Sequence, residues 1–251
     1  MRQQEEPRQD IIAGRNSIME ALKSGRDIEA LLVARGERSG TAGVIVAKCR
    51  ERGIPVKEVS PQKLDFLCVD ANHQGMALIA GAHTYSTVEE ILESAASLGE
   101  PPFVIICDAL EDPHNLGAVI RTAEAAGAHG IIIPKRNSAG LTYATSKAAC
   151  GALEYMPVAR VSNIAQTIEQ LKAKGLWIYG ADMLGELWVK QDLTGALALV
   201  IGSEGGGISR LIKEKCDILL SLPMKGRINS LNASVAGGIL MYEIARQRAG
   251  I

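Results

Sequence analysis

Small polar side chains gather ahead of the last predicted helix of this 251-residue chain. Ser230, Asn232 and Ser234 bring two hydroxyls and an amide to the start of an apolar segment at residues 233–245. The first backbone N–H groups of a helix have no partner within it, and the amino end of a helix favours negative charge. These side chains could therefore bind an anionic or polar ligand, or Asn232 could be only a helix cap and Ser230 a turn residue.

A second polar stretch follows an apolar run at residues 103–107, which has the composition of a buried strand. It carries Asn115 and Arg121, which lead into and along a helix predicted near residues 116–126 and closed by Gly127. An amide and a guanidinium here could contact a polar or anionic ligand. Asn115 could equally be a cap, and Arg121 an exposed charge on a solvated helix face, where most arginines lie.

A glycine-rich stretch follows the apolar run at residues 196–201 and includes Gly202, Glu204 and Gly205. Glycine lets a backbone approach a ligand closely and adopt turns that other residues resist. The stretch reads GSEGGGIS, so it fits neither the GxGxxG pattern of dinucleotide-binding folds nor the phosphate-binding loop that ends in Lys-Ser or Lys-Thr. By itself it predicts a tight turn and no particular cofactor.

Apolar runs that alternate with helices must position these three stretches. Continuous apolar strands separated by helices predict a parallel sheet covered on both faces. Ligands of open parallel sheets bind at the carboxyl ends of the strands, and each of the three stretches follows a strand. The strands of this region are predicted at residues 103–107, 130–133, 176–181, 196–201 and 218–222.

The first part of the chain predicts a separate, small α/β unit at residues 11–82, preceded by a polar flexible tail at residues 1–10. Ser17 and Glu20 have the spacing of a capping box that starts a short first helix, and Gly25 stands where this helix should stop. The other elements expected in the unit are a strand at 28–33, a helix at 42–52, a strand at 56–59, a helix at 61–67 and a strand at 76–80.

A linker that contains a helix is predicted at residues 83–102, ahead of a second domain at residues 103–251. Ser86 and Glu89 begin the helix by their capping-box spacing, and the helix ends before a Gly-Glu-Pro-Pro break. The boundary between the two domains is therefore expected at this break.

Composition excludes several classes of protein. With 47% hydrophobic and 22% charged residues, and no apolar segment long enough to span a membrane, the chain is expected to be cytoplasmic. Its five cysteines are scattered without a CxxC pair, so neither a disulfide framework nor a metal site is expected. A net charge of −1 excludes a uniformly basic surface but permits a local basic patch. Aromatic residues, at 4%, are too few for a platform that stacks single-stranded nucleic acid, so any recognition of RNA would rest on backbone contacts and pocket shape.

Taken together, the three stretches are far more specific than any one of them. In this order and at this spacing they resemble the three motifs of the SpoU (TrmH) family of RNA ribose 2'-O-methyltransferases, from about Phe103 to the C-terminus. They read NLGAVIRTAEAAG, LVIGSEGGGIS and LPMKGRINSLNASVAGGILMYE. In the first unit, AGRNSIMEAL and NHQGMAL resemble the L30e-like substrate-binding domain of the subgroup that methylates a guanosine in 23S ribosomal RNA.

The resemblance implies an architecture and a cofactor. Members of this family use S-adenosylmethionine, form homodimers and fold their C-terminal part into a SPOUT-type parallel sheet with a deep trefoil knot. General folding rules would have argued against the knot, because threaded chains are nearly absent among known folds. By motif position, the residues expected to bind the cofactor are Gly202, Gly205, Leu222 and Leu231.

The resemblance also implies catalytic and RNA-binding residues. Arg121 is the position most closely tied to catalysis in the family. It would grip the target phosphate and stabilise the developing alkoxide, or act as a deprotonated base, which a normal pKa above 12 disfavours. The other catalytic residues expected are Asn115, Glu204, Ser230 and Asn232. RNA contacts are expected in the first unit from Arg15, Asn72, His73 and Gln74. His73 could instead be only a surface turn residue.

Other functions stay open at this point. A tRNA ribose methyltransferase would perform the same chemistry on another RNA. A non-catalytic RNA-binding protein fits the L30e-like first unit, but it would not need the polar residues of the three motifs. A nucleotide-cofactor oxidoreductase fits the parallel α/β pattern, but the chain lacks GxGxxG and the acidic residue about 20 positions further on. Binding of S-adenosylmethionine, of NAD or of neither would separate these classes.

Overall fold

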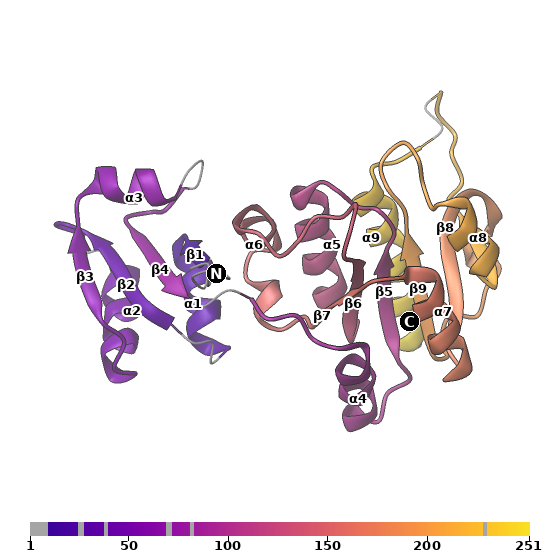
Figure 1. The fold of residues 1–251 in the computed structure, drawn as a ribbon, viewed down its shortest axis with the longest axis horizontal. Coiled ribbons are helices and arrows are strands. Elements are labelled where there is room, and N and C mark those ends of the chain that lie inside the picture. The colour runs from indigo at the N-terminus through magenta and orange to yellow at the C-terminus, as the bar shows by residue number, and fades with distance from the viewer. Residues whose placement is uncertain (1–9, 25–27, 38–39, 69–71, 81–82, 228–229) are drawn as a thin grey trace, which may run out of the picture. The chain divides into compact units, whose positions relative to one another are not determined.

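The computed structural model describes residues 10–24, 28–37, 40–68, 72–80, 83–227 and 230–251. The chain divides into two compact units (Figure 1). The first comprises Met1–Thr84 and Leu141–Tyr155, and the second comprises Tyr85–Gly140 and Met156–Ile251. The tail expected at residues 1–10, except for Asp10, and the helix stop expected at Gly25 lie outside the described residues.

The first unit contains a four-stranded mixed sheet in the order β1-β4-β2-β3. β1 and β2 pair antiparallel with β4, and β3 pairs parallel with β2. Nearly every side chain along the central strands β2 and β4 is buried, and successive side chains point to opposite faces, so both faces of the sheet are apolar and helices must cover both. The strands are β1 (Asp10–Ala13), β2 (Ile28–Ala34), β3 (Val56–Val59) and β4 (Met76–Ala80).

Helices cover both faces of this sheet. α1 (Arg15–Lys23) and α2 (Gly40–Glu51) share one core cluster, and α3 (Pro61–Leu67) buries Leu64 in the other. A segment from later in the chain completes the unit, since α6 (Tyr143–Ala149) packs beside β1 and the 3-10 helix η1 (Ala152–Glu154) packs on α1. Hydrogen bonds from Ser24 Oγ to Glu154 (3.0 Å) and from Tyr155 to Glu20 (2.6 Å) fix the end of this segment.

The second unit contains a six-stranded sheet in the order β10-β8-β9-β5-β6-β7, and all of its pairings are parallel. The parallel α/β class predicted for this region is therefore confirmed. Its central strands are completely buried, because both faces are covered. The strands are β5 (Phe103–Cys107), β6 (Gly130–Pro134), β7 (Val158–Val161), β8 (Trp177–Leu187), β9 (Leu197–Ile201) and β10 (Ile218–Ser221).

Two groups of helices cover this sheet (Figure 1). α4 (Val88–Leu98), α7 (Ile164–Ala173) and α8 (Arg210–Lys215) share a core with Val104, Ile106 and the inward residues of the neighbouring strands. α5 (Pro113–Ala125) and α9 (Ala233–Arg248) lie side by side on the opposite face. α9 comes so close to β9 that a Cβ on Gly237 would lie 2.4 Å from the side chain of Ile201. The amino ends of α5 and α9 therefore lie near the carboxyl edge of the sheet.

Candidate active site

Side chains from all three motifs meet at this edge of the second unit. Asn115 lies on α5, Glu204 lies in the loop after β9, and Asn232 is the residue that caps α9. Glu204 Oε1 accepts hydrogen bonds from Asn115 Nδ2 at 2.7 Å and from Asn232 Nδ2. Asn232 Nδ2 also donates to Asn115 Oδ1 at 3.0 Å. The structure thus joins three predicted site residues that lie up to 117 positions apart, and we call them the amide–carboxylate cluster.

Asp112 extends this cluster and was missed in the sequence. Its Oδ1 accepts from the backbone N–H of His114 at 2.9 Å, and its Oδ2 accepts from Asn115 Nδ2 at 3.1 Å. Asp112 is therefore the cap of α5, and the interpretation of Asn115 as a cap is wrong. The pair Asp112-Pro113 is itself a signal for a helix start, but the helix was predicted to begin near Leu116.

Ser234 also joins the cluster. Its Oγ lies 2.6 Å from Asn232 Oδ1 and 3.2 Å from Asn115 Oδ1, so the hydroxyl donates toward both amide oxygens. Asn232 Oδ1 accepts from the backbone N–H groups of Ser234 (3.0 Å) and Val235 (3.2 Å), which confirms that Asn232 caps α9. The cap and the cluster are therefore one structure, and the two interpretations of Asn232 do not compete.

The hydrogen bonds use every amide N–H in the cluster. Asn115 Nδ2 donates to Asp112 and Glu204, and Asn232 Nδ2 donates to Glu204 and Asn115. An NH₂ group has only two protons, so neither amide can donate to a ligand without breaking one of these bonds. The two asparagines therefore tie α5, the loop after β9 and the start of α9 together, which is a positioning role.

The glycine-rich loop after β9 is a closed hairpin. Ser203 and Gly207 exchange two backbone hydrogen bonds of 3.0 Å, and Glu204 lies in the exposed turn between them. A Cβ on Gly202 would lie 2.0 Å from the backbone carbon of Gly207, so no other residue fits there. The close approach predicted at Gly202 is therefore first of all an approach of the chain to itself. Gly205, at φ 82°, has the left-handed conformation that glycine tolerates best.

The other residues expected to bind the cofactor lie in the segment between β10 and α9. Leu222 directly follows β10 and is half-buried, while Ser230 and Leu231 are exposed just ahead of Asn232. In the sheet, β8 lies between β9 and β10, so Gly202 and Leu222 follow strands about 10 Å apart. The bond between Asn232 and Glu204 brings Leu231 close to the hairpin, whereas Leu222 has no such link to the cluster among the described residues.

Arg121 lies on α5, and its side chain is exposed. It is six residues beyond Asn115, which corresponds to about 9 Å along the helix axis and about 120° around it. Arg121 therefore leaves α5 on a different face from Asn115, further along the same helix.

Two titrating groups bear on the chemistry of this edge. Burial raises the pKa of the Cys107 thiol, at the end of β5, to about 12, so this thiol stays protonated and is a poor nucleophile. Burial also opposes ionisation of Asp182 on β8, but hydrogen bonds from Lys213 and from the backbone of Leu184 outweigh it, so the pKa of Asp182 lies below its ordinary value. Asp182 is therefore charged and paired with Lys213 at 2.5 Å.

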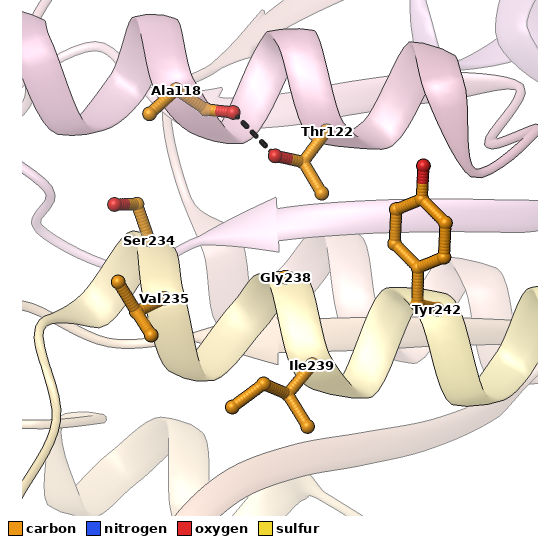
Figure 2. Close-up of a pocket in the computed structure, with 7 residues that line it drawn as sticks. All are labelled: Ala118, Thr122, Ser234, Val235, Gly238, Ile239 and Tyr242. Atoms are coloured by element: carbon orange, nitrogen blue, oxygen red, sulfur yellow. Dashed lines mark hydrogen bonds between the residues drawn. The ribbon is translucent and has the colours of Figure 1, made fainter.

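A groove of about 520 Å³ runs between α5 and α9, beside the cluster (Figure 2). Thr122 donates its hydroxyl to the carbonyl of Ala118 at 2.9 Å, so its methyl group remains for packing toward α9. Val235, Ile239 and Tyr242 follow each other at helical spacing along α9 and are 50%, 37% and 54% exposed. The groove is lined by Ala118, Thr122, Ser234, Val235, Gly238, Ile239 and Tyr242.

In the first unit, the predicted RNA-binding residues also come together. Gln74 accepts from the backbone N–H of Arg15 through Oε1 at 3.1 Å, and its carbonyl accepts from the Arg15 guanidinium at 3.2 Å. Asn72 Oδ1 accepts from the backbone N–H of Gln74 at 3.3 Å, and His73 Nδ1 accepts from that of Gly75 at 2.9 Å. We call residues 72–75 the RNA turn, after the contacts that are predicted for them. Arg15 also pairs with Glu37 at 3.4 Å, so its charge is partly compensated.

Two negative findings concern the described residues alone. No group of three or more His, Cys, Asp or Glu side chains among them could hold a metal ion. None of their helices combines the length and the apolar character needed to cross a membrane.

Comparison with known proteins agrees with both units. Residues 102–242 match the family model for the SpoU rRNA Methylase family, and residues 11–86 match that for RNA 2'-O ribose methyltransferase substrate binding. A putative TrmH family tRNA/rRNA methyltransferase of Bacillus subtilis, YacO, is 46% identical over 240 residues, which cover 95% of this chain and 96% of that protein.

Solved structures share the fold of the whole chain. The SpoU methyltransferase AviRb from Streptomyces viridochromogenes, in complex with the cofactor AdoMet, superposes with a TM-score of 0.82 at 25% identity over 97% of this chain and 92% of that one. An AdoMet-bound rRNA methyltransferase from Sinorhizobium meliloti gives 0.79 at 27% identity over 96% and 87%. Because a family model spans more than half of the chain and a relative of nearly half identity covers almost all of it, this chain belongs to the SpoU (TrmH) family of S-adenosylmethionine-dependent RNA methyltransferases.

Proposed function

We propose that this chain methylates the 2'-hydroxyl of a guanosine ribose in 23S ribosomal RNA, with S-adenosylmethionine as the methyl donor. The observation that carries the proposal is the amide–carboxylate cluster, because one residue from each of three motifs meets there at the carboxyl edge of the sheet. A protein that only binds RNA would not need this cluster. The substrate-binding family match over residues 11–86 supports RNA as the substrate.

Apolar surface and open backbone beside the cluster fit the cofactor. Leu231 is 41% exposed next to the hairpin, and Gly205 lies in its exposed turn with open space where a Cβ would lie. A nucleoside binds well between apolar walls and backbone groups that read its edge. Gly202, Gly205, Leu222 and Leu231 are the residues that would hold it. When bound, S-adenosylmethionine supplies a sulfonium methyl group that is open to in-line attack.

Arg121 is the residue that we assign to the reacting hydroxyl. A ribose hydroxyl is a poor nucleophile until its proton is moved, and negative charge then develops on its oxygen. A guanidinium keeps its proton at neutral pH, so Arg121 acts by holding the target phosphate and stabilising that oxygen. The cluster contributes by fixing α5, which carries Arg121, against the hairpin and α9. Ser230, exposed in the segment before α9, completes the proposed set.

We further propose that the chain forms a homodimer through the groove between α5 and α9. The apolar stripe of Val235, Ile239 and Tyr242 is solvated in the single chain, and a second copy would bury it in a two-fold contact. Ile239→Glu should therefore give monomers in size-exclusion chromatography with light scattering. Val44→Glu, at an apolar position of α2 that is 49% exposed, is the matched control and should remain dimeric.

We also propose that the second unit contains a trefoil knot, with which its strand order is consistent.

Methyl transfer to defined RNAs tests the proposal. The purified protein is incubated with methyl-labelled S-adenosylmethionine and with 23S ribosomal RNA or tRNA transcripts that carry no modification. Labelled 2'-O-methylguanosine in the digested ribosomal transcript is the expected result. Label in tRNA alone would show that tRNA, and not ribosomal RNA, is the substrate, since relatives are named for both RNAs. A nucleoside methylated on its base would contradict ribose methylation.

A further inference from the structure

A strongly exposed aromatic ring lies on α3 of the first unit. Phe66, on α3, is 79% exposed, and it is the only Phe, Trp or Tyr among residues 1–84. The only other phenylalanine of the chain, Phe103, is completely buried in the second unit. A ring of this size contributes little to folding when it stays in water, because the hydrophobic gain comes from the area removed from water.

α3 presents this ring on a fixed support. Leu64 is completely buried in the core beneath the helix, and Ser60 caps the helix through the N–H of Lys63 at 3.3 Å. On a helix, residue 66 lies about 160° around the axis from residue 64, so Phe66 points opposite to the buried side. Lys63 is exposed one turn earlier, within reach of a phosphate next to any base on the ring.

The same helix is bonded to the RNA turn. Asp65 Oδ1 lies 3.0 Å from His73 Nε2, and His73 Nδ1 accepts from Gly75, so Nε2 carries the proton and donates to Asp65. The residue next to Phe66 is thus linked to the turn that also holds Arg15 through Gln74. These contacts place Phe66 next to a residue, Asp65, that is bonded to the turn predicted to meet RNA.

We propose that Phe66 stacks on an unpaired base of the RNA substrate and so forms a base-binding subsite of the first unit. The inference rests on the RNA methyltransferase function proposed above. The composition excludes a platform of several rings, but a single ring is enough for one base. The other exposed residues of α3 are Pro61, Gln62, Lys63 and Asp65, so mainly polar side chains surround the ring on this helix, which argues against an apolar docking surface for a protein partner. A ring beside a cation instead suits a base with its phosphate.

Fluorine NMR can observe this contact directly. A protein labelled with 4-fluorophenylalanine contains only two labelled positions, Phe66 and Phe103, and the buried one is an internal control. Addition of an unstructured RNA decamer should shift and broaden the Phe66 signal and leave that of Phe103 in place. The same sequence as a duplex should have much less effect, because its bases are already stacked. Binding of the decamer without a change at Phe66 would overturn the subsite.

Affinity measurements with matched variants complete the test. Phe66→Leu keeps an apolar side chain but loses the ring, so RNA binding should weaken by about 5-fold to 150-fold, the range for one stacked base. Phe66→Trp should bind within about 3-fold of the original protein, since a larger ring also stacks. The dependence on salt should be unchanged in both, whereas Lys63→Ala should lower the slope of log affinity against log salt by about 0.7. Val44→Ala, in the same unit, is the control.

The outcomes separate this inference from the proposed function. If the original protein methylates RNA and Phe66→Leu binds the RNA with the same affinity, the proposed base-binding subsite is wrong and the proposed methyltransferase function is retained. If the original protein neither binds nor methylates RNA, both are wrong. S-adenosylmethionine affinity should be equal in all the variants, which shows that the second unit is intact.

Discussion

Two hydrogen-bonded clusters of amide side chains, one in each unit, are built in opposite ways. The cluster of Asn115, Glu204 and Asn232 joins residues 28 to 117 positions apart, and its amide protons are all used within it. The RNA turn is formed by four consecutive residues that are bonded to one another, and its side chains link it to Arg15 and Asp65. Its side chains at Asn72 and Gln74 remain exposed.

From this difference we expect the two clusters to have different roles. A cluster whose donors are saturated can hold loops in place but cannot read a ligand without breaking, so it suits the fixed geometry that a transfer reaction needs. A short exposed turn has free faces and costs little to rearrange, so it suits recognition of RNA. We therefore expect changes in the second unit to act on turnover and stability, and changes in the RNA turn to act on RNA affinity.

Removal of Arg121 should have the largest effect. Arg121→Ala should lower kcat by about 10² to 10⁴, the scale of one positioned catalytic group, because in the proposed mechanism its charge acts mainly on the transition state. Single-turnover methylation at saturating RNA measures this rate. Arg121→Lys should recover only part of the loss, since lysine keeps the charge but not the planar fork. A near-normal rate in Arg121→Ala would show that Arg121 has no catalytic role and is only a charge on the surface of the helix.

Substitution in the hairpin should have the next largest effect, on folding. In Gly202→Ala the new methyl group would meet backbone atoms of Gly207 and Ile208 within 2.3 Å, so the unfolding free energy should fall by about 3 kcal/mol or more. Gly206→Ala is the control in the same loop, because its methyl group meets only the Ser203 hydroxyl, at 3.0 Å. It should change stability by less than about 1 kcal/mol. Equal melting temperatures of the two variants would show that the hairpin can rearrange to accommodate a methyl group at residue 202.

A smaller loss is expected at the cap of α9. Asn232→Ala removes the cap of the helix and leaves one carboxylate oxygen of Glu204 with a single donor, so stability should fall by about 2 kcal/mol. Turnover should fall together with stability, because the hairpin and α9 lose their link. Urea unfolding and the methylation rate measure the two effects. A stable variant with full activity would contradict the positioning role.

The matched change in the RNA turn should hardly alter stability. Gln74 has φ 49°, a left-handed conformation that costs about 1 kcal/mol for a residue with a side chain, so Gln74→Gly relieves strain while it loses the bond to Arg15. The two effects should cancel to within about 1 kcal/mol in urea unfolding. RNA affinity should nevertheless fall, and kcat at saturating RNA should not. A loss of kcat at saturating RNA would contradict the expectation that the RNA turn acts on RNA affinity alone.

The smallest effect concerns pH. Burial is the main cause that lowers the pKa of His129 below its ordinary 6.5, against an opposing effect of Glu100. The unfolded chain therefore binds a proton more readily than the folded chain, and stability should fall as the pH drops through 6.5 toward the lowered value. His129→Asn keeps an acceptor for the N–H of Phe103 and should flatten the difference in melting temperature between pH 7.5 and 5.5. If the pH dependence of the melting temperature were unchanged in His129→Asn, other titrating groups would be its cause.

Local signals in the sequence predicted most elements but misplaced several ends. The strand predicted at 103–107 and the helix predicted at 61–67 are confirmed, because an apolar run and a Ser-Pro helix start act over a few residues. The capping box predicted at Ser17 is wrong, since α1 begins after Gly14 and Ser17 lies inside it. The box predicted at Ser86 is one residue too early, because Thr87 and Glu90 form it.

The missed elements and contacts depend on distant parts of the chain. β1 was missed because four residues become a strand only by pairing with β4. β7 was missed because its short run pairs with β6 and contains the exposed Arg160. The motifs indicated which residues gather at the edge of the sheet, but the bonds among Asp112, Asn115 and Ser234 follow from the packing of α5 against α9. No spacing within one motif contains that information.

The division of the chain has a practical consequence for protein engineering. Since Leu141–Tyr155 belongs to the first unit, the chain passes between the units three times, and neither unit is one continuous piece of sequence. A fragment that starts at Ser86 would retain this segment without the sheet on which it packs. Ala149, Ala152 and Leu153, all buried in the complete chain, would then face water. Such a fragment should be prone to aggregate, and a short polar loop in place of residues 141–155 should make it soluble.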